Sequence, residues 1–229
     1  RCNAQSKKLK SVLHYLPKDS RMNSKKHGPV LYRYRKSRCL GPASEEDIKL
    51  AKAACVTNDS VGHRVGVLLI HGFIANAYSM HQLKQGLEAC AYQISVPLLP
   101  GHGGASEDMA GVKLEQWVEC VYAAYEKLRQ SCESVIVVGQ SLGGVLSTLI
   151  EYRFRSVEQL ILLAPAFNPP WILSASPVLV PICKFFGIRY FPNIAGDVMR
   201  EDAYDVSFKK IHIDSYIQLK KACELGRDA

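Results

Sequence analysis

The sequence predicts an α/β fold built on a parallel sheet, and three observations point to it. Short apolar runs recur through the middle of the chain, and the run from Val65 to Ile70 is apolar throughout. A strand with two apolar faces is typical of a parallel sheet that is covered on both sides. Segments with helical spacing separate the runs, and turn signals such as Pro100-Gly101 close them. This alternation favours a parallel sheet with flanking helices.

Length and composition limit the class of protein. The chain has 229 residues, of which 48% are hydrophobic, enough for one sizeable core. No run of 18 or more apolar residues occurs, so the sequence predicts no membrane-spanning helix. None of the eight cysteines forms a Cys-x-x-Cys pair, which leaves a zinc or thioredoxin-like site without support. We interpret the cysteines as small buried hydrophobes rather than disulfide partners. No metal or organic cofactor is implied.

The positive charge is concentrated at the start of the chain. Residues 1–38 hold twelve Lys or Arg and a single acid, Asp19, hence +11, and the remaining 17 basic and 20 acidic residues give −3. We interpret residues 1–40 as a flexible, solvated basic arm, because such a composition rarely packs. A basic arm can also make weak contact with an anionic membrane surface. We expect no nucleic-acid partner.

The predicted elements follow in order. Ser44 begins a short helix, because the following Glu-Glu-Asp supplies acids to its first turn. Four apolar runs predict strands, and three segments with helical spacing lie between or after them. The expected strands are 65–70, 93–98, 134–138 and 160–163, and the expected helices are 79–90, 114–128 and 143–152.

The character of the chain changes after Pro165. Asn168-Pro169-Pro170-Trp171 breaks the alternation, and an apolar stretch interrupted by prolines follows. The segment from Ser207 to Glu224 has helical spacing, and no further core strand is evident. We therefore divide the chain into the arm, an α/β core at 41–165, and a largely helical lid at 166–229.

The most informative segment is Gly139-Gln140-Ser141-Leu142-Gly143, which joins a buried strand to a helix. Such a strained turn needs small residues two before and two after the serine, and Gly139 and Gly143 supply them. The turn predicts that the Ser141 hydroxyl is lifted out at the carboxyl end of the sheet. It also predicts that the backbone N–H of Leu142 faces developing negative charge. The alternative is an ordinary tight turn whose serine caps the helix.

His71-Gly72-Phe73 directly follows the first apolar strand. An acyl-transfer site needs a second backbone donor from another loop, and the N–H of Phe73 fits that need. Gly72 would let the chain turn closely. We interpret His71 as a residue that holds this loop by hydrogen bonds rather than as a base. We interpret His102 in the same way, as a residue that holds its own loop in place.

These motifs, with Leu99-Pro100-Gly101-His102-Gly103 between them, resemble those of the α/β-hydrolases. More narrowly, the segment 65–225 is similar to bacterial carboxylesterases, monoacylglycerol lipases and related serine aminopeptidase-like hydrolases. The resemblance implies that Ser141 is a nucleophile, that Phe73 and Leu142 donate oxyanion N–H groups, and that 166–229 is a lid. It also implies a triad in the chain order Ser, Asp, His.

The triad's acid and base do not follow as the resemblance requires. No buried strand leads into Asp197, His212 lies in lid-like sequence, and Asp202, Asp205 and Asp214 fit no better. We therefore expect the final strands of the sheet to be missing and the acid and base to lie beyond Ala229. A serine without its base is a poor nucleophile, so we expect the chain as given to be nearly inactive.

The resemblance implies a hydrolase for carboxylic esters with an apolar acyl group, including monoacylglycerols. An acyl transferase or thioesterase would use the same site. In such an enzyme the lid would line the acyl pocket, although plain lid packing is the alternative for most of its apolar side chains. These side chains are Trp171, Ile172, Leu173, Val178, Leu179, Phe185 and Phe186. A binding protein of this fold without acid and base is the alternative function.

Overall fold

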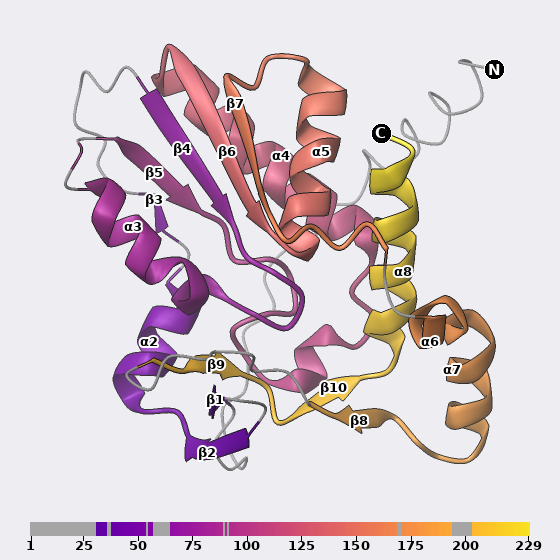
Figure 1. Cartoon of the computed structure of the whole chain (residues 1–229). Helices are drawn as coiled ribbons and strands as arrows, with labels where there is room; N and C mark the ends of the chain where they lie inside the picture. Colours follow the sequence, from indigo (N-terminus) through magenta and orange to yellow (C-terminus); the bar gives the residue numbers. More distant parts are fainter. Residues whose placement is uncertain are drawn as a thin grey trace.

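A computed structural model of the chain shows a parallel sheet with helices on both faces and a smaller layer at one end (Figure 1). It describes residues 31–35, 38–53, 55–56, 65–88, 90, 92–168, 171–193 and 203–229. Most of the predicted basic arm lies outside these residues. In the described part of the chain, no helix combines the length and apolar character that crossing a membrane requires.

The main sheet has five strands in the order β3-β5-β4-β6-β7. The pairs β5–β4, β4–β6 and β6–β7 are parallel, while the short β3 is antiparallel to β5. The register places Ile70 opposite Gly139, so the ends of β4 and β6 meet at one edge. The bounds are β3 (Cys55–Val56), β4 (Val65–Ile70), β5 (Gln93–Val96), β6 (Ser134–Gln140) and β7 (Gln159–Leu163).

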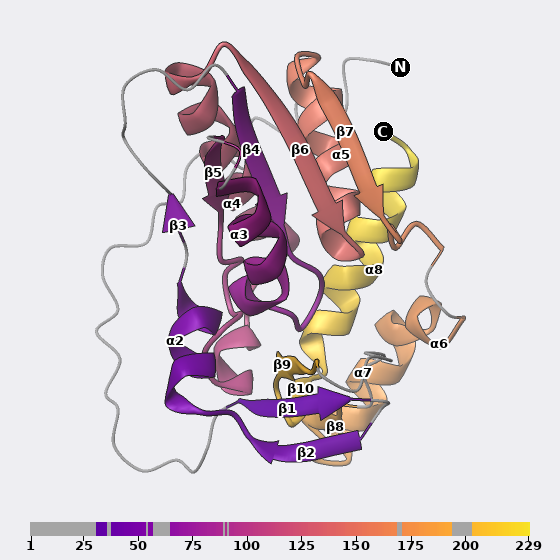
Figure 2. The ribbon, with the colours of Figure 1, turned by 60° about the vertical axis from the view of Figure 1, so that its left-hand side comes forward.

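The two faces of β4 explain its continuous apolar run. Leu68 and Ile70 belong to the core beneath α4 (Leu114–Ser131) and α5 (Leu142–Phe154). Val67 and Leu69 point the other way, into a smaller cluster that includes Met80 of the short 3-10 helix Ala77–Met80. Figure 2 shows α3 (His81–Glu88) on this second face and α4 and α5 behind the sheet. The α/β fold with a parallel sheet is confirmed.

The layer at the carboxyl ends of the strands is built largely from the last quarter of the chain. The strand arrows of β4, β6 and β7 point toward it in Figure 1. A three-stranded sheet, β2-β1-β9, and a two-stranded sheet, β10-β8, form part of it. Its elements are β1 (Tyr32–Arg35), β2 (Arg38–Pro42), α6 (Trp171–Ser174), α7 (Ser176–Phe185), β8 (Tyr190–Pro192), β9 (Asp205–Ser207), β10 (Lys210–His212) and α8 (Asp214–Arg227). We call α6 through α8 the cap.

The structure changes the bounds of two expected segments. The helices α6, α7 and α8 make up most of the described residues of the cap, but it also contains the three short strands β8, β9 and β10, and the expected helix over 207–224 begins only at Asp214. Local spacing missed the strands because they pair with distant segments, β9 with β1 for example. The predicted arm also ends too late, since residues 32–35 already form a strand against β9. The predicted start of helix α2 (Glu45–Lys52) at Ser44 is confirmed, because the N-cap residue Ser44 and Asp47 form a capping box.

β7 is the edge strand of the described sheet. Two of its apolar side chains are substantially exposed, Ile161 at 42% and Leu163 at 41%. The other edge carries the short antiparallel β3. The strands β5, β4 and β6 are therefore interior. The chain runs from β4 to β5 on one side and then to β6 on the other side of β4, and an open α/β sheet holds its ligand at the carboxyl ends of the strands at such a switch point.

Candidate active site

Ser141 lies between the last residue of β6 and the first residue of α5. Its φ of 52° and ψ of −114° are unfavourable for a residue with a side chain. Adjacent backbone holds this strained turn: the Ser141 N–H donates to the carbonyl of Leu163 at 2.9 Å, and its own carbonyl accepts from Ala166 at 3.2 Å. The strand-turn-helix context predicted for the serine is present.

The two glycines that flank the turn cannot be replaced without displacing backbone. A Cβ at Gly143 would lie 2.1 Å from the carbonyl oxygen of Ile70, at the end of β4. One at Gly139 would lie 2.3 Å from the carbonyl oxygen of Gly143. Their role is therefore steric: they let α5 start directly against β4 and β6.

Gly72 brings the loop after β4 against the serine. A Cβ at this position would lie 3.3 Å from the Cβ of Ser141 and 3.9 Å from its Oγ. The motifs that the sequence placed at two strand ends are thus neighbours in space. Within the described residues, neither the N–H of Phe73 nor that of Leu142 has a hydrogen-bond partner. Their use as oxyanion donors remains a prediction.

His71 is buried beneath this loop with both ring nitrogens in use. Nδ1 lies 2.9 Å from the carbonyl oxygen of Gly72, and Nε2 accepts from the N–H of Leu99 at 3.1 Å. Because Nε2 must be an acceptor, the proton is on Nδ1, which donates to Gly72. Burial lowers the pKa of His71 to about 3, with a smaller contribution from His102. The neutral imidazole therefore links two strand-end loops and has no free lone pair for a base.

His102 packs beside His71, with ring centroids 5.1 Å apart. Its Nδ1 lies 3.1 Å from the carbonyl oxygen of Pro100, which also accepts from the indole N–H of Trp117. Burial lowers the pKa of His102 to about 4. Its Nε2 is buried with no partner among the described atoms. The imidazole ring of His102 packs beside the ring of Phe73, with the two ring centroids 6.4 Å apart.

Sequence reasoning missed the residues that hold the Phe73 loop from the cap. Asn76, 1% exposed, donates from its side chain to the carbonyl of Val206 at 2.8 Å. Ser207 donates to the carbonyl of Ile74 at 2.8 Å. Ile74 needs this support because its φ is 57°, which is unfavourable for a β-branched residue. No local pattern could reveal bonds that join positions 130 or more residues apart.

Tyr216 of α8 covers the loop from a third side. Its ring lies 5.8 Å from the ring of Phe73 and 5.9 Å from that of Phe191 in β8. Burial raises the pKa of the Tyr216 hydroxyl. Tyr216, which belongs to the expected lid at 166–229, thus contacts the loop that carries Phe73.

None of the acid or base candidates that the structure describes is paired with Ser141. His212 accepts from the backbone N–H of Asp214 at 3.4 Å, and its ring lies 5.2 Å from Tyr190, so its contacts are within the cap. Asp214 pairs with Lys184 at 2.6 Å. Asp205 bonds its neighbour Val206, and burial raises its pKa. Asp197 and Asp202 lie outside the described residues.

The apolar lid side chains are distributed differently from the expected pocket. Leu173 is buried, whereas Val178, Leu179, Phe185 and Phe186 are exposed and so line no acyl pocket. The side chains of Trp171 and Ile172 are outside the described set. The expectation is therefore wrong for the four exposed residues, because α7 turns them outward.

Two further features of the described residues concern metal binding and the burial of the cysteines. In the described ranges, no three His, Cys, Asp or Glu side chains gather in a way that could hold a metal ion. Six described cysteines are free, but only Cys223 is fully buried. The reading of the cysteines as buried hydrophobes thus holds for Cys223 and is wrong for the exposed Cys39 and Cys90.

Comparison with known proteins agrees with this geometry. A family model described as "Alpha/beta hydrolase family" matches residues 67–214. The chain is 29% identical over 157 residues to the thermostable monoacylglycerol lipase of Bacillus sp. (strain H-257), covering 69% of this chain and 61% of that enzyme. It is 36% identical over 87 residues to a carboxylesterase of Bacillus subtilis (strain 168), covering 38% of this chain and 35% of that protein. The match thus spans about three fifths of the length of the lipase and about one third of the length of the carboxylesterase.

Solved structures show the same fold. The structure reported for LipS and LipT, two metagenome-derived lipolytic enzymes, superposes with a TM-score of 0.68 at 24% identity, covering 74% of this chain and 68% of that one. The monoacylglycerol lipase of Paleococcus ferrophilus gives a TM-score of 0.54 at 17% identity, covering 73% and 69%. At these identities the similarity is one of fold.

Proposed function

Because the chain belongs to the alpha/beta hydrolase family, we propose that it is part of a serine hydrolase that cleaves carboxylic esters through an acyl-enzyme on Ser141. The observation that carries the proposal is the strained backbone of Ser141, at φ 52°, beside Gly72 at the carboxyl ends of two parallel strands. A residue held in such a conformation points to function, because strain persists only where surrounding structure enforces it. The names of the bacterial relatives favour an ester substrate.

The first half of the reaction is addition and loss of the alcohol. The Oγ of Ser141 attacks the ester carbonyl carbon and gives its proton to a base. The carbonyl oxygen becomes an oxyanion, which the N–H groups of Phe73 and Leu142 would bind. The C–O bond then breaks, and the alcohol leaves with the proton from the base, so that the acyl group remains on Ser141. Removing one donor of such a pair typically slows the step by about 10²–10³-fold.

The second half is hydrolysis of the acyl-enzyme. Water attacks the same carbonyl carbon and gives its proton to the base, and the carboxylic acid leaves as Ser141 regains its hydroxyl proton. In the proposed mechanism the base is a histidine oriented by a carboxylate. The described His71, His102 and His212 all have other hydrogen-bond partners and none is paired with Ser141, so we assign no described residue to either role.

The substrate we propose is a small ester with an apolar acyl group, and monoacylglycerol is the specific candidate. Hydrolysis of p-nitrophenyl acyl esters and of monoacylglycerol by the intact gene product tests this directly. We expect Ser141→Ala to remove at least about 10⁴-fold of the turnover number while leaving the fold intact. A Ser141→Ala variant that retained the wild-type rate would reject the acyl-enzyme on Ser141.

A binding protein of the same fold is the second candidate. It is favoured by one observation, that no described histidine or carboxylate forms a hydrogen bond with Ser141. It is disfavoured by the strained serine, which a binding site does not need. Isothermal titration with a monoacylglycerol separates the two: a binder gives saturable heat without release of fatty acid, whereas the hydrolase releases fatty acid in proportion to time.

A further inference from the structure

The loop that carries Phe73 is a four-residue turn from Gly72 to Ala75. The N–H of Ala75 donates to the carbonyl of Gly72 at 3.3 Å and closes the turn. Ile74, the third residue, has a φ of 57°, whereas turns with a positive φ at this place usually take glycine or asparagine. A β-branched residue keeps such a conformation only where its surroundings enforce it. A contact from outside the turn must therefore hold Ile74.

Ser207 of β9 supplies that contact. Its hydroxyl donates to the carbonyl of Ile74 at 2.8 Å, and the residue is only 2% exposed. The side-chain amide of Asn193 donates to the Oγ of Ser207 at 3.1 Å, which leaves the hydroxyl proton for Ile74. The backbone of Ser207 is fixed as well, because it pairs with Tyr32 in β1. The cap thus presents a buried, oriented donor to the turn.

The bond from Ser207 fixes the peptide group between Ile74 and Ala75. A trans peptide is planar, and its C=O and N–H point in opposite directions. At one end of this peptide the carbonyl of Ile74 accepts from Ser207, and at the other end the N–H of Ala75 donates to Gly72. The position of Ser207 is therefore transmitted to the carbonyl of Gly72.

The carbonyl of Gly72 in turn orients the N–H of Phe73, because the two groups belong to one planar peptide. This carbonyl accepts from the N–H of Ala75 and lies 2.9 Å from the Nδ1 of His71, which donates to it. The N–H of Phe73 must point away from both donors. Two hydrogen bonds, one of them dependent on Ser207, thus determine the direction of the proposed oxyanion donor.

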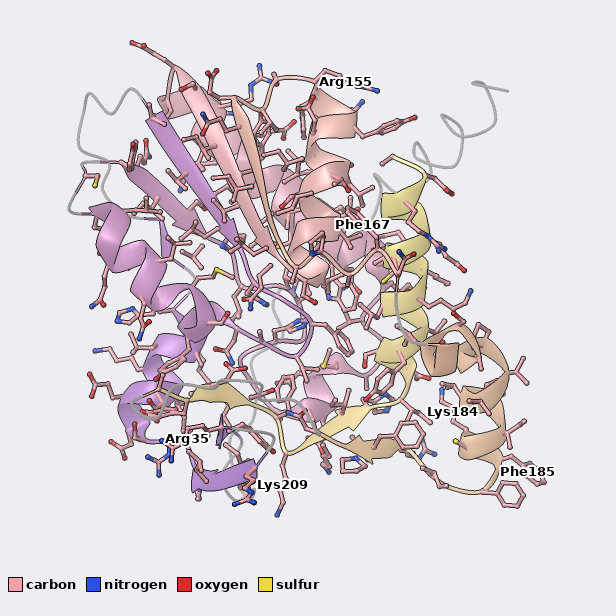
Figure 3. The ribbon with its side chains drawn as sticks, viewed as in Figure 1. Arg35, Arg155, Phe167, Lys184, Phe185 and Lys209 are labelled. Carbon is pink, nitrogen blue, oxygen red and sulfur yellow. The ribbon has the colours of Figure 1, made fainter. Side chains whose placement is uncertain are left out.

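These two supports reach the turn from opposite sides. His71 directly follows β4 and is fully buried in the core. Ser207 lies in β9, in the layer beyond the carboxyl ends of the strands (Figure 1). Figure 3 shows Lys209, two residues after Ser207, at the outer edge of that layer and away from the main sheet. The core therefore supports the turn from within, and the cap supports it from outside.

We propose that Ser207 is a positioning residue for ester hydrolysis. It acts through the peptide between Ile74 and Ala75 and through the carbonyl of Gly72 on the N–H of Phe73. Without the Ser207 hydroxyl the strained turn relaxes and this N–H turns away, and hydrogen bonds weaken steeply as they bend. The inference rests on the proposed function, because the N–H of Phe73 binds an oxyanion only if Ser141 forms an acyl-enzyme.

The first test compares Ser207→Ala with Ser215→Ala in the intact gene product, assayed with p-nitrophenyl acyl esters. Ser215 is the matched control, because it is 1% exposed and donates to the carbonyl of His212 at 2.6 Å within the cap. We expect Ser207→Ala to lower kcat by about tenfold or more, short of the about 10²–10³-fold cost of losing a whole donor. KM should stay within about twofold, since the donor acts mainly in the transition state. Ser215→Ala should keep kcat, and thermal unfolding should show both variants folded at the assay temperature.

The second test uses an alkyl boronic acid, whose tetrahedral adduct with Ser141 places an oxygen where the oxyanion forms. Its affinity should fall in Ser207→Ala by the same factor as kcat, while the affinity for the corresponding alkyl amide, which keeps a planar carbonyl, should not change. Ser207→Thr retains the hydroxyl and should recover most of both losses. If Ser207→Ala does not fold, Ser207→Cys replaces it, because a thiol is a weaker donor of similar shape and should produce smaller losses in the same two quantities.

Four results would overturn the inference while leaving the hydrolase in place. These are an unchanged kcat in Ser207→Ala, equal losses of kcat in Ser207→Ala and Ser215→Ala, a fall in kcat without a fall in boronate affinity, and no recovery in Ser207→Thr. Failure of the proposed function looks different. In that case the unaltered protein releases no acid from the ester, or Ser141→Ala retains the rate, and the role of Ser207 is rejected with it.

Discussion

The side-chain amide of Asn76 donates a hydrogen bond to the carbonyl oxygen of Val206 at 2.8 Å, across 130 residues of sequence. The same side chain accepts from the backbone N–H of Tyr78 at 3.1 Å. Asn76 follows the loop that carries Phe73, and Val206 lies in β9 of the cap. The loop facing Ser141 is therefore fixed from two sides, by His71 in the core and by Asn76 to the cap.

Replacing Asn76 with alanine should destabilise the protein. The change removes a buried donor and leaves the carbonyl of Val206 without that partner, which typically costs about 1–3 kcal/mol. Urea unfolding measures the change in the free energy of unfolding. Asn168→Ala is the matched control, because Asn168 is exposed and the same substitution there should change stability by less than about 0.5 kcal/mol. Equal effects in the two variants would mean that the bond to β9 contributes nothing.

Alanine at Gly143 and alanine at Gly86 should have opposite effects. At Gly143 the new Cβ would meet the carbonyl of Ile70 at 2.1 Å, so α5 must move, and we expect a loss of about 3 kcal/mol or more. At Gly86, in α3, the Cβ meets nothing within 4 Å, and the helix should gain about 0.5 kcal/mol. Thermal unfolding of both variants measures this. A stable Gly143→Ala variant would contradict the close approach of α5 to β4.

The buried histidines should make the protein sensitive to acid. Burial lowers the pKa values of His71 and His102 to about 3 and about 4, whereas an unfolded histidine titrates near about 6.5. Between about pH 6 and 4 the unfolded chain binds protons that the folded chain does not. Stability therefore falls with falling pH, by about 1.4 kcal/mol per pH unit for each histidine.

The variant His102→Asn isolates this contribution. In urea unfolding between pH 7.5 and about pH 4.5, the slope below about pH 6 should be shallower by about 1.4 kcal/mol per pH unit than in the unaltered chain. His81→Asn, on α3, keeps both buried imidazoles and should keep the slope. If His102→Asn had the original slope, His102 would have to take up its proton in the folded state.

Much of the core could be predicted because its signals are local. The run Val65–Ile70 is apolar on both faces because helices cover both, and the Ser-Glu-Glu-Asp start of α2 forms the expected capping box. The glycine spacing around Ser141 predicted a strand-turn-helix, which the structure contains. In each case neighbours in sequence determine the conformation.

The cap and its bonds to the site could not be predicted in this way. β9 forms because it pairs with β1, and Ser207 supports the loop after β4 because it donates to the carbonyl of Ile74, both across more than 130 residues. For the segment that forms α7, the sequence indicated only an apolar stretch from Ile172 to Phe186 that is interrupted by prolines. Such a stretch does not tell which of its side chains are buried. For this reason Phe185 and Phe186 were expected in a pocket and lie at the surface instead.

The central claim is that Ser141 is an activated nucleophile, and labelling with a fluorophosphonate tests it most directly. The reagent reacts with a serine whose proton a base removes, so peptide mass spectrometry of the labelled intact gene product should place the adduct on Ser141. The Ser141→Ala variant should remain unlabelled while keeping its unfolding midpoint. Failure of the folded, intact gene product to label, or an adduct on another serine that persists in Ser141→Ala, would contradict the account.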